Sequence, residues 1–188
     1  MLLQNIIIFA LLVCTTGVAY CLMNKNNHIP LETLLGNPTT TSPKVSPQGT
    51  HLAYIKPDTN NVLNVWVKTV NKDNDIMVTS DNNKGVRSYS WCQDNKHILY
   101  LQDKDGDENN HIYMTNIQTK KTIDLTPYEG VKATMLTHNK FHPDYLVCTM
   151  NKEDRSLFDV YKINLKTKET TLIMNVTATQ YISLLNKN

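Results

Sequence analysis

The stretch HNKFHPDYLVCTMNKEDRSLFDVYKINLKTKETTLI, residues 138–173, decides the fold because the chain contains it three times in similar form. The two other copies are KVSPQGTHLAYIKPDTNNVLNVWVKTVNKDNDIMVT, residues 44–79, and YSWCQDNKHILYLQDKDGDENNHIYMTNIQTKKTIDL, residues 89–125. Each copy has an early turn with Pro, Asp or Gly, followed by an apolar alternating run. Such a repeat indicates one supersecondary unit that needs its neighbours to bury an apolar face.

The copies align on one aromatic residue each, Trp66, Tyr113 and Tyr161, which lie 47 and 48 residues apart. Around each of them, β-branched and aromatic residues alternate with period two, and turn signals separate the runs. This pattern predicts short, half-buried strands. We interpret the three aromatic residues as packing residues and not as a ligand-stacking set.

A period in the high forties with about four strands per unit is typical of a β-propeller blade. The sequence therefore predicts an all-β fold, a partial β-propeller of about three four-stranded blades. The blades are expected near residues 44–80, 86–126 and 131–174, within a propeller domain at 44–188. Residues 24–43 are expected to form a linker into the first strand, with helical spacing in IPLETLLG, residues 29–36.

The first 23 residues form a hydrophobic leader, which is expected to be helical. Residues 6–23, IIIFALLVCTTGVAYCLM, carry no charge, and the small residues Gly17 and Ala19 suit cleavage by a signal peptidase after Ala19. The stretch is also long enough to span a bilayer, so an uncleaved membrane anchor stays open, as does lipid attachment at Cys21. In each case we expect an exported chain, periplasmic or associated with the cell envelope, whose only membrane contact is the leader.

Composition excludes several classes of function. The net charge is +2 and the basic residues are interspersed with acidic ones, so we expect no nucleic-acid partner. Two of the four cysteines belong to the leader, and the other two, Cys92 and Cys148, lie in different repeats. They are expected to be separate strand residues, although an exported chain leaves a disulfide between them open. No cysteine or histidine spacing suggests zinc.

Three groups of polar residues invite a functional interpretation. The acidic run Asp103–Asn110 has oxygen ligands at alternate positions, but Gly106 is misplaced for an EF-hand, so a solvated hairpin is favoured over a calcium site. His138 and His142 lie four apart in a segment that enters a strand, where they would be over about 13 Å apart and unsuited to share a metal. Arg87 and Arg155 are the only arginines. We favour a structural ion pair for Arg155, with Asp154 or Glu153.

Several phrases resemble the amino-terminal β-propeller of the prolyl oligopeptidase family. They are PLETLLGNPTTTSPKVSPQGTHLAYI, DGDENNHIYMTNIQTKKTIDLTPYEGVKA and NKEDRSLFDVYKINLKTKETTLI, and the likeness runs in order from Ile29 to Ile173. The dipeptidyl-aminopeptidase and acylaminoacyl-peptidase members are the most similar, and TolB-type propellers are similar too. The chain departs from the family at Thr167 and Lys168, where Thr-Gly is usual in the hairpin.

This resemblance implies a propeller that covers a hydrolase domain and filters peptide substrates by size. None of the seven serines lies in a G-x-S-x-G motif, so no catalytic residue, cofactor site or metal site is assigned, and the chain on its own is not expected to be an enzyme. We expect a non-catalytic fragment of an exported serine peptidase, from a truncated or split gene, with a separately encoded hydrolase half as its partner. The alternative is a stand-alone TolB-like module that binds another envelope protein.

Overall fold

The computed structural model describes residues 29–176, and the chain divides after Gly36 into two units. The described part of the first unit holds the short helix α2 (Leu31–Leu35), where the sequence showed helical spacing. The N–H groups of Thr33 and Leu34 donate to the carbonyl of Pro30 at 2.9 and 3.2 Å. The predicted leader lies outside the described residues, within which no helix has the length and apolar character needed to cross a membrane.

The second unit contains three four-stranded antiparallel sheets, and each sheet takes its strands in chain order. The first sheet holds β1 (Thr41–Val45), β2 (His51–Pro57), β3 (Leu63–Thr69) and β4 (Ile76–Met77); the second holds β5 (Tyr89–Trp91), β6 (His97–Gln102), β7 (His111–Asn116) and β8 (Thr122–Asp124); the third holds β9 (Ala133–Thr137), β10 (Tyr145–Met150), β11 (Asp159–Asn164) and β12 (Thr170–Met174). The predicted all-β fold of three four-stranded blades is confirmed.

The start of the first sheet differs from the expected boundary. Strand β1 begins at Thr41, inside the segment 24–43 that was expected to be a linker. Thr41 pairs with Ile55, but the register shifts before Lys44, and Ser42 has a φ of 54°. The Ser-Pro pair at residues 42–43 indicates a turn when only the sequence is considered, because Pro cannot donate a hydrogen bond within a sheet. The register shift also interrupts the alternation of inward and outward side chains.

The repeat is preserved in the strand register. Trp66 lies opposite Tyr54 in the first sheet, Tyr113 opposite Tyr100 in the second, and Tyr161 opposite Cys148 in the third. Positions counted from these three aromatic residues are therefore equivalent between sheets. This equivalence allows the environment of a residue in one sheet to be compared with that of its counterparts.

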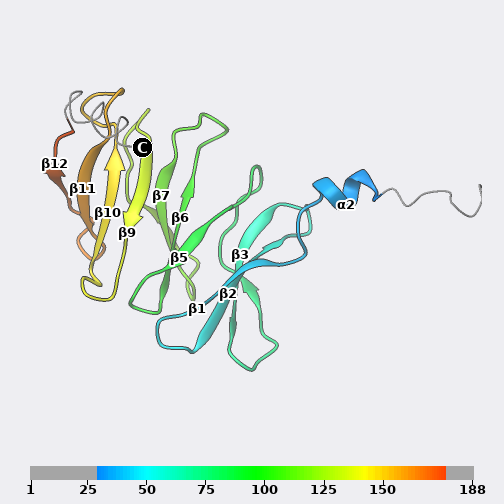
Figure 1. Cartoon of the computed structure of the whole chain (residues 1–188). Coiled ribbons are helices and arrows are strands. Elements are labelled where there is room, and N and C mark those ends of the chain that lie inside the picture. The colour runs from blue at the N-terminus through cyan, green and yellow to red at the C-terminus, as the bar shows by residue number, and fades with distance from the viewer. Residues whose placement is uncertain (1–28, 177–188) are drawn as a thin grey trace, which may run out of the picture. The chain divides into compact units, whose positions relative to one another are not determined.

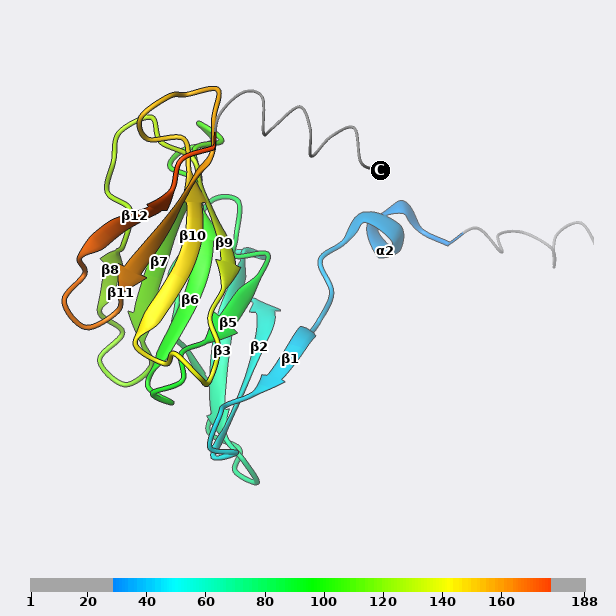
Figure 2. The ribbon, with the colours of Figure 1, turned by 60° about the vertical axis from the view of Figure 1, so that its left-hand side comes forward.

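The core lies between the sheets, in two clusters of buried side chains. The cluster between the first and second sheets contains Ala53, Ile55, Leu63, Val65, Val67, Val78, Val86, Tyr89, Trp91, Ile98, Tyr100 and Ile117. The cluster between the second and third contains Cys92, Leu99, Ile112, Met114, Leu125, Val131, Ala133, Leu146, Cys148, Met150, Tyr161, Ile163 and Leu165. The second sheet thus packs between its two neighbours (Figures 1 and 2). Burying each large side chain contributes about 1.5–3 kcal/mol.

Hydrogen bonds also join the first and second sheets. The indole Nε1 of Trp91 donates to the Lys44 carbonyl at 3.0 Å, and the Tyr89 hydroxyl donates to the Ser42 carbonyl at 2.7 Å. The Asn95 side-chain amide donates to Thr50 Oγ1 at 2.9 Å, which links the early turns of two successive repeats. The turn residues therefore position whole sheets as well as their own strands.

The connections between sheets follow one route. After β4 the chain returns to the start of β3, where the Val86 N–H donates to the Leu63 carbonyl at 2.8 Å. Gly85 makes this approach possible, because a Cβ there would lie 2.9 Å from both the N and the O of Leu63. After β8 the chain returns beside the start of β7, where the Ala133 N–H donates to the Asn110 carbonyl at 2.7 Å.

Candidate functional site

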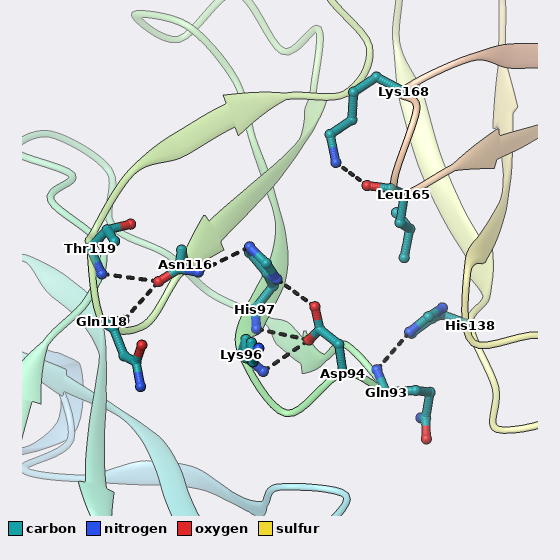
Figure 3. Close-up of polar contacts among 10 residues, drawn as sticks. All are labelled: Gln93, Asp94, Lys96, His97, Asn116, Gln118, Thr119, His138, Leu165 and Lys168. Atoms are coloured by element: carbon teal, nitrogen blue, oxygen red, sulfur yellow. Dashed lines mark hydrogen bonds and ion pairs between the residues drawn. The ribbon is translucent and has the colours of Figure 1, made fainter.

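A polar network occupies one end of the second sheet, close to the third (Figure 3). His97 Nδ1 lies 2.6 Å from Asp94 Oδ2, and the Asn116 amide donates to His97 Nε2 at 3.2 Å. Because both ring nitrogens are engaged, the imidazole has no free lone pair with which to take a proton from a substrate. The Asp–His pair therefore holds the β5–β6 turn to β7 and does not form half of a catalytic triad.

Asp94 fixes this turn through its other carboxylate oxygen as well. Oδ1 accepts the N–H groups of Lys96 and His97 at 2.9 and 3.1 Å. Burial on its own raises the pKa of the Asp94 carboxyl, but the hydrogen bonds from Lys96 and His97 outweigh it and hold the pKa below its usual range. Asp94 thus remains an ionised acceptor at neutral pH.

His138 bridges the second and third sheets (Figure 3). Its Nε2 accepts the Gln93 N–H at 3.1 Å, and its Nδ1 donates to the Tyr145 carbonyl at 2.9 Å. These bonds require a neutral ring with the proton on Nδ1. The backbone N–H of the other histidine of the pair, His142, donates to Asn139. Among residues 29–176, no group of three or more His, Cys, Asp or Glu side chains is placed to hold a metal.

A cavity of about 340 Å³ lies beside this network. It is lined by Cys92, Asp94, His97, Met114, Ile123, Pro143, Asp144, Leu165, Lys166 and Lys168. Burial lowers the pKa of Lys168, whose ammonium donates to the Leu165 carbonyl and is therefore not free for a ligand. Burial also raises the pKa of Cys92, so this thiol stays protonated and is a poor nucleophile.

Cys92 and Cys148 are both free and buried, and they belong to the same core cluster. Burial raises the pKa of Cys148 to about 12. The disulfide that the sequence left open is absent from this structure. Both side chains act as small apolar groups of the core.

The acidic run forms a hairpin end. Asp103 pairs with Lys84 at 2.8 Å and accepts the Glu108 N–H, while Asp107 accepts the N–H groups of Lys104 and Asn109. Gly106 has a φ of 88°, as the hairpin interpretation requires. The carboxylates of Asp103 and Asp107 are thus engaged with the loop's own backbone, and that of Asp103 also with a neighbouring lysine.

The expected ion pair of Arg155 is replaced by hydrogen bonds to backbone. Its guanidinium donates to the carbonyls of Asn151 and Glu129 at 3.0 and 3.1 Å, and none of the ion pairs among residues 29–176 includes it. Asp154 instead accepts hydrogen bonds from Ser156. A planar guanidinium can donate to carbonyls in two loops as readily as to a carboxylate, which charge counting along the sequence cannot show. Arg87 is exposed at the start of the second sheet.

The aligned aromatic residues differ in environment. Tyr161 is buried in the core, and its hydroxyl has no hydrogen-bond partner within the described part of the chain. Tyr113 stacks on Tyr100 with ring centroids 5.6 Å apart. Trp66 lies with Tyr54 on the face of the first sheet that points away from the second, which we call the first end face.

Charged side chains cover the first end face. The Lys56 ammonium lies 4.4 Å from the Trp66 ring centroid and 3.1 Å from Asp75 Oδ2. The hydrogen bond from Lys56 lowers the pKa of Asp75, and burial together with Asp75 raises the pKa of Tyr54 to about 12. Tyr54 is buried beneath these charged residues, while Trp66 stays partly exposed beside the Lys56 ammonium. This cap was missed in the sequence because Lys56 and Asp75 belong to different strand ends.

Among residues 29–176, no ion pair like that of Lys56 and Asp75 covers the opposite end of the sheet stack. Val147, Thr149, Val160 and Lys162 share the face of β10 and β11 that points away from the second sheet, which we call the third end face. All four are partly exposed. The equivalents of Val160 are covered: Val65 and Ile112 are 0% exposed. Lys162 lies 4.8 Å from the Tyr145 ring, and among residues 29–176 it forms no ion pair.

The strands of the third end face thus pair in the same register as those that form interfaces between sheets. The face carries partly exposed apolar side chains and a lysine that forms no ion pair within residues 29–176. No described constellation has the free nucleophile and base of a hydrolase.

Comparison with known proteins gives the same architecture. No family model matches the chain. The chain is 33% identical over 146 residues to the dipeptidyl aminopeptidase BIII of Pseudoxanthomonas mexicana, a match that covers 77% of this chain and 21% of that protein. It is 29% identical over 182 residues to dipeptidyl peptidase family member 6 of Caenorhabditis elegans, covering 93% and 23%. The chain thus spans about a fifth of the length of these curated relatives.

Solved structures of the same fold include three of interest. TolB from Acinetobacter baumannii aligns with a TM-score of 0.52 at 17% identity, over 72% of this chain and 32% of that one. The acylaminoacyl peptidase of Pyrococcus horikoshii aligns with a TM-score of 0.52 at 15% identity, over 74% and 26%. The β-propeller domain of the Trilobed protease from Pyrococcus furiosus aligns with a TM-score of 0.51 at 16% identity, over 73% and 44%.

Proposed function

The chain is a relative of the prolyl oligopeptidase-type peptidases through their β-propeller portion, and from that premise we propose that it is the non-catalytic, substrate-gating part of an exported serine peptidase. The observation that carries this proposal is the match of most of the chain to only a fifth of a dipeptidyl aminopeptidase. The catalytic Ser-Asp-His residues would come from a hydrolase polypeptide that binds this chain, and the substrates would be peptides.

Two further observations support the proposal. The third end face offers an uncovered surface of the kind that joins blades, so a partner has a place to bind. The uncharged run at residues 6–23 favours export to the periplasm or cell envelope.

A second candidate is a stand-alone envelope module that binds another protein. The TolB structure aligns with the same TM-score as the acylaminoacyl peptidase, 0.52, and this alignment is the observation that supports the alternative. In this case no hydrolase would be needed, and the third end face would bind a structural protein of the envelope.

The two candidates are separated by mixing the purified chain with the product of the reading frame downstream. Size-exclusion chromatography with light scattering reports a complex, and a dipeptide reporter substrate reports activity. The peptidase proposal expects a complex that hydrolyses the reporter when neither component alone does. A compact chain that neither binds this product nor changes its activity would contradict the gating role and favour the envelope module.

A further inference from the structure

A short motif recurs where the chain enters the second and the third sheet. Residues 85–87, Gly-Val-Arg, precede β5, and residues 130–132, Gly-Val-Lys, precede β9 at a spacing of 45 residues. The two glycines have φ values of 78° and 65°, and the two valines are 0% and 2% exposed. Each copy therefore presents a basic side chain, Arg87 or Lys132, directly after a buried valine.

Hydrogen bonds hold the backbone beside both basic residues. The Val86 N–H donates to the Leu63 carbonyl at 2.8 Å. The Lys132 N–H donates to Asn151 Oδ1 at 2.7 Å, and the Lys132 carbonyl accepts the Asn151 N–H at 3.3 Å. Binding a ligand here would require little further ordering of the main chain, which lowers the cost of association.

The side chains of Arg87 and Lys132 line one cavity of about 720 Å³. It lies where β5 and β7 begin and β6 ends, at the end of the second sheet opposite the pair of Asp94 and His97. Its volume is within the range of about 300–1,000 Å³ that small-molecule sites occupy. The cavity thus has room for a short organic ligand as well as for an ion.

The cavity has an excess of basic groups without partners. Among residues 29–176, the side chains of Arg87 and Lys132 form no ion pair and no hydrogen bond. Of the two acidic residues in the lining, Asp103 is paired with the Lys84 ammonium at 2.8 Å. Glu108 is then the one acid left to oppose two cations, so the cavity favours an anion.

Two side-chain amides add further donors. Gln102 and Asn110 line the same cavity and are partly buried, and within residues 29–176 their amides form no hydrogen bond. A carboxylate has about four lone-pair sites; a guanidinium can fill two of them at once, and an ammonium or an amide fills one. The lining therefore has the donors that hold a carboxylate.

We propose that this cavity binds the carboxylate of a peptide, with Arg87 and Lys132 as its charged ligands. The carboxylate chemistry follows from the cavity itself, whereas the choice of a peptide rests on the proposed peptidase role. A peptide C-terminus and an Asp or Glu side chain present the same chemistry. The peptides used in the test separate these two sources.

The test is a titration of the purified chain alone, followed by the NMR shifts of the Arg87 and Lys132 backbone N–H groups. The probes are N-acetyl-trialanine, its C-terminal amide, which has no charge, and N-acetyl-Ala-Asp-Ala amide, whose only carboxylate is on the side chain. At least one of the two carboxylate peptides should bind about tenfold more tightly than the neutral amide, and it identifies the source. Equal affinity for all three peptides, or for acetate and the peptides, would overturn the proposal.

Charge variants test the assigned ligands. Arg87→Gln and Lys132→Gln should each weaken binding of the preferred peptide about tenfold, while Lys72→Gln, which removes an exposed cation outside the cavity, should not change it. Glu108→Gln should tighten binding about threefold, a gain that partial unfolding cannot produce. Unchanged affinity in the first two variants, or no gain in the Glu108 variant, would reject the site.

Failure of this site is distinguishable from failure of the proposed function. Binding is measured on this chain alone, so the lack of a hydrolase partner would leave the result unchanged. If the complex forms and hydrolyses the dipeptide reporter, but the Arg87 and Lys132 variants bind peptides as the natural chain does, the site alone is rejected.

Discussion

At the scale of single residues, two glycines with the same backbone conformation have different surroundings. Gly85 has a φ of 78° and lies against the backbone of Leu63, whereas Gly49 has a φ of 74° and open space within 4 Å of the point where a Cβ would lie. We expect Gly85→Ala to lower the free energy of unfolding by about 3 kcal/mol or more, because the Leu63 backbone must move. Gly49→Ala, the matched control, should cost only about 1 kcal/mol of left-handed backbone strain.

Urea unfolding followed by tryptophan fluorescence measures both values. Similar losses for the two variants would show that the close approach to Leu63 contributes nothing to stability.

The hairpin between β7 and β8 has a lysine where a glycine is best suited. Lys120 has a φ of 58°, and Lys168 occupies the equivalent place in the third sheet with a φ of 69°. The Asn116 side chain still accepts the Gln118 and Thr119 N–H groups at 3.0 Å, so the turn remains tight without glycine. Lys120→Gly should raise the free energy of unfolding by about 0.5–1 kcal/mol through relief of left-handed strain.

Lys121→Gly is the neighbouring control, since Lys121 does not have a positive φ. Chemical denaturation should show this variant destabilised or unchanged. Stabilisation of both variants to the same extent would mean that the left-handed backbone is not the cause.

At the scale of elements, a buried threonine lies in the loop after each of the first two sheets. Its hydroxyl binds the third strand of that sheet. Thr126 Oγ1 accepts the Ile112 N–H at 2.9 Å, and Thr79 Oγ1 accepts the Val65 N–H at 2.9 Å; Thr79 and Thr126 are both buried. Thr126→Val keeps the shape but leaves the N–H of Ile112 without an acceptor. We expect a loss of about 1–3 kcal/mol in the free energy of unfolding.

Thr126→Ser retains the hydroxyl and is the control for this prediction. Denaturant unfolding together with amide hydrogen exchange at Ile112 measures the effect. Unchanged exchange at Ile112 in the valine variant would contradict the role given to this hydroxyl.

The β5–β6 turn is expected to weaken in acid. The folded pKa of Asp94 is held below its usual range, so its contribution to stability is complete above the unfolded value of about 3.9 and is lost as the pH falls through the lower folded value. Asp94→Asn should therefore destabilise the protein at pH 7 and have a smaller effect near pH 3. Urea midpoints of the two proteins at both pH values measure this difference, and a constant difference would contradict it.

At the scale of the whole molecule, the side chains of the second sheet that a hydrolase could use are engaged or protonated. Both imidazole nitrogens of His97 are engaged, and the Cys92 thiol stays protonated. We expect the purified chain alone to hydrolyse no aminoacyl, dipeptidyl or acyl-peptide reporter. Turnover abolished by a single Ser→Ala change at any of the seven serines would contradict this expectation.

Much of the fold was predictable from the sequence, because local rules act within each repeat. Period-two alternation around Trp66, Tyr113 and Tyr161 and the intervening turn residues indicated three sheets of four strands. The acidic run connects β6 and β7 as a hairpin end, as expected, and Gly106 has the positive φ that this interpretation required; Asp105 and Glu108 have positive φ as well. The start of β1 was misjudged, because the irregular register at Ser42 hides the strand signal.

The sequence by itself determined the repeat, its strands and the absence of a G-x-S-x-G nucleophile, because these depend on residues close together in the chain. Only the tertiary structure decided that Arg155 binds carbonyls of two loops and that His138 joins two sheets. It also decided that Lys56 pairs with Asp75 on one end face, whereas Lys162 on the other forms no ion pair within residues 29–176. The hydrogen-bond and ion-pair partners of these residues are distant in sequence, or are one of several polar groups that could serve equally well. Which group becomes the partner depends on how the sheets stack, and the pattern of a single repeat does not predict that stacking.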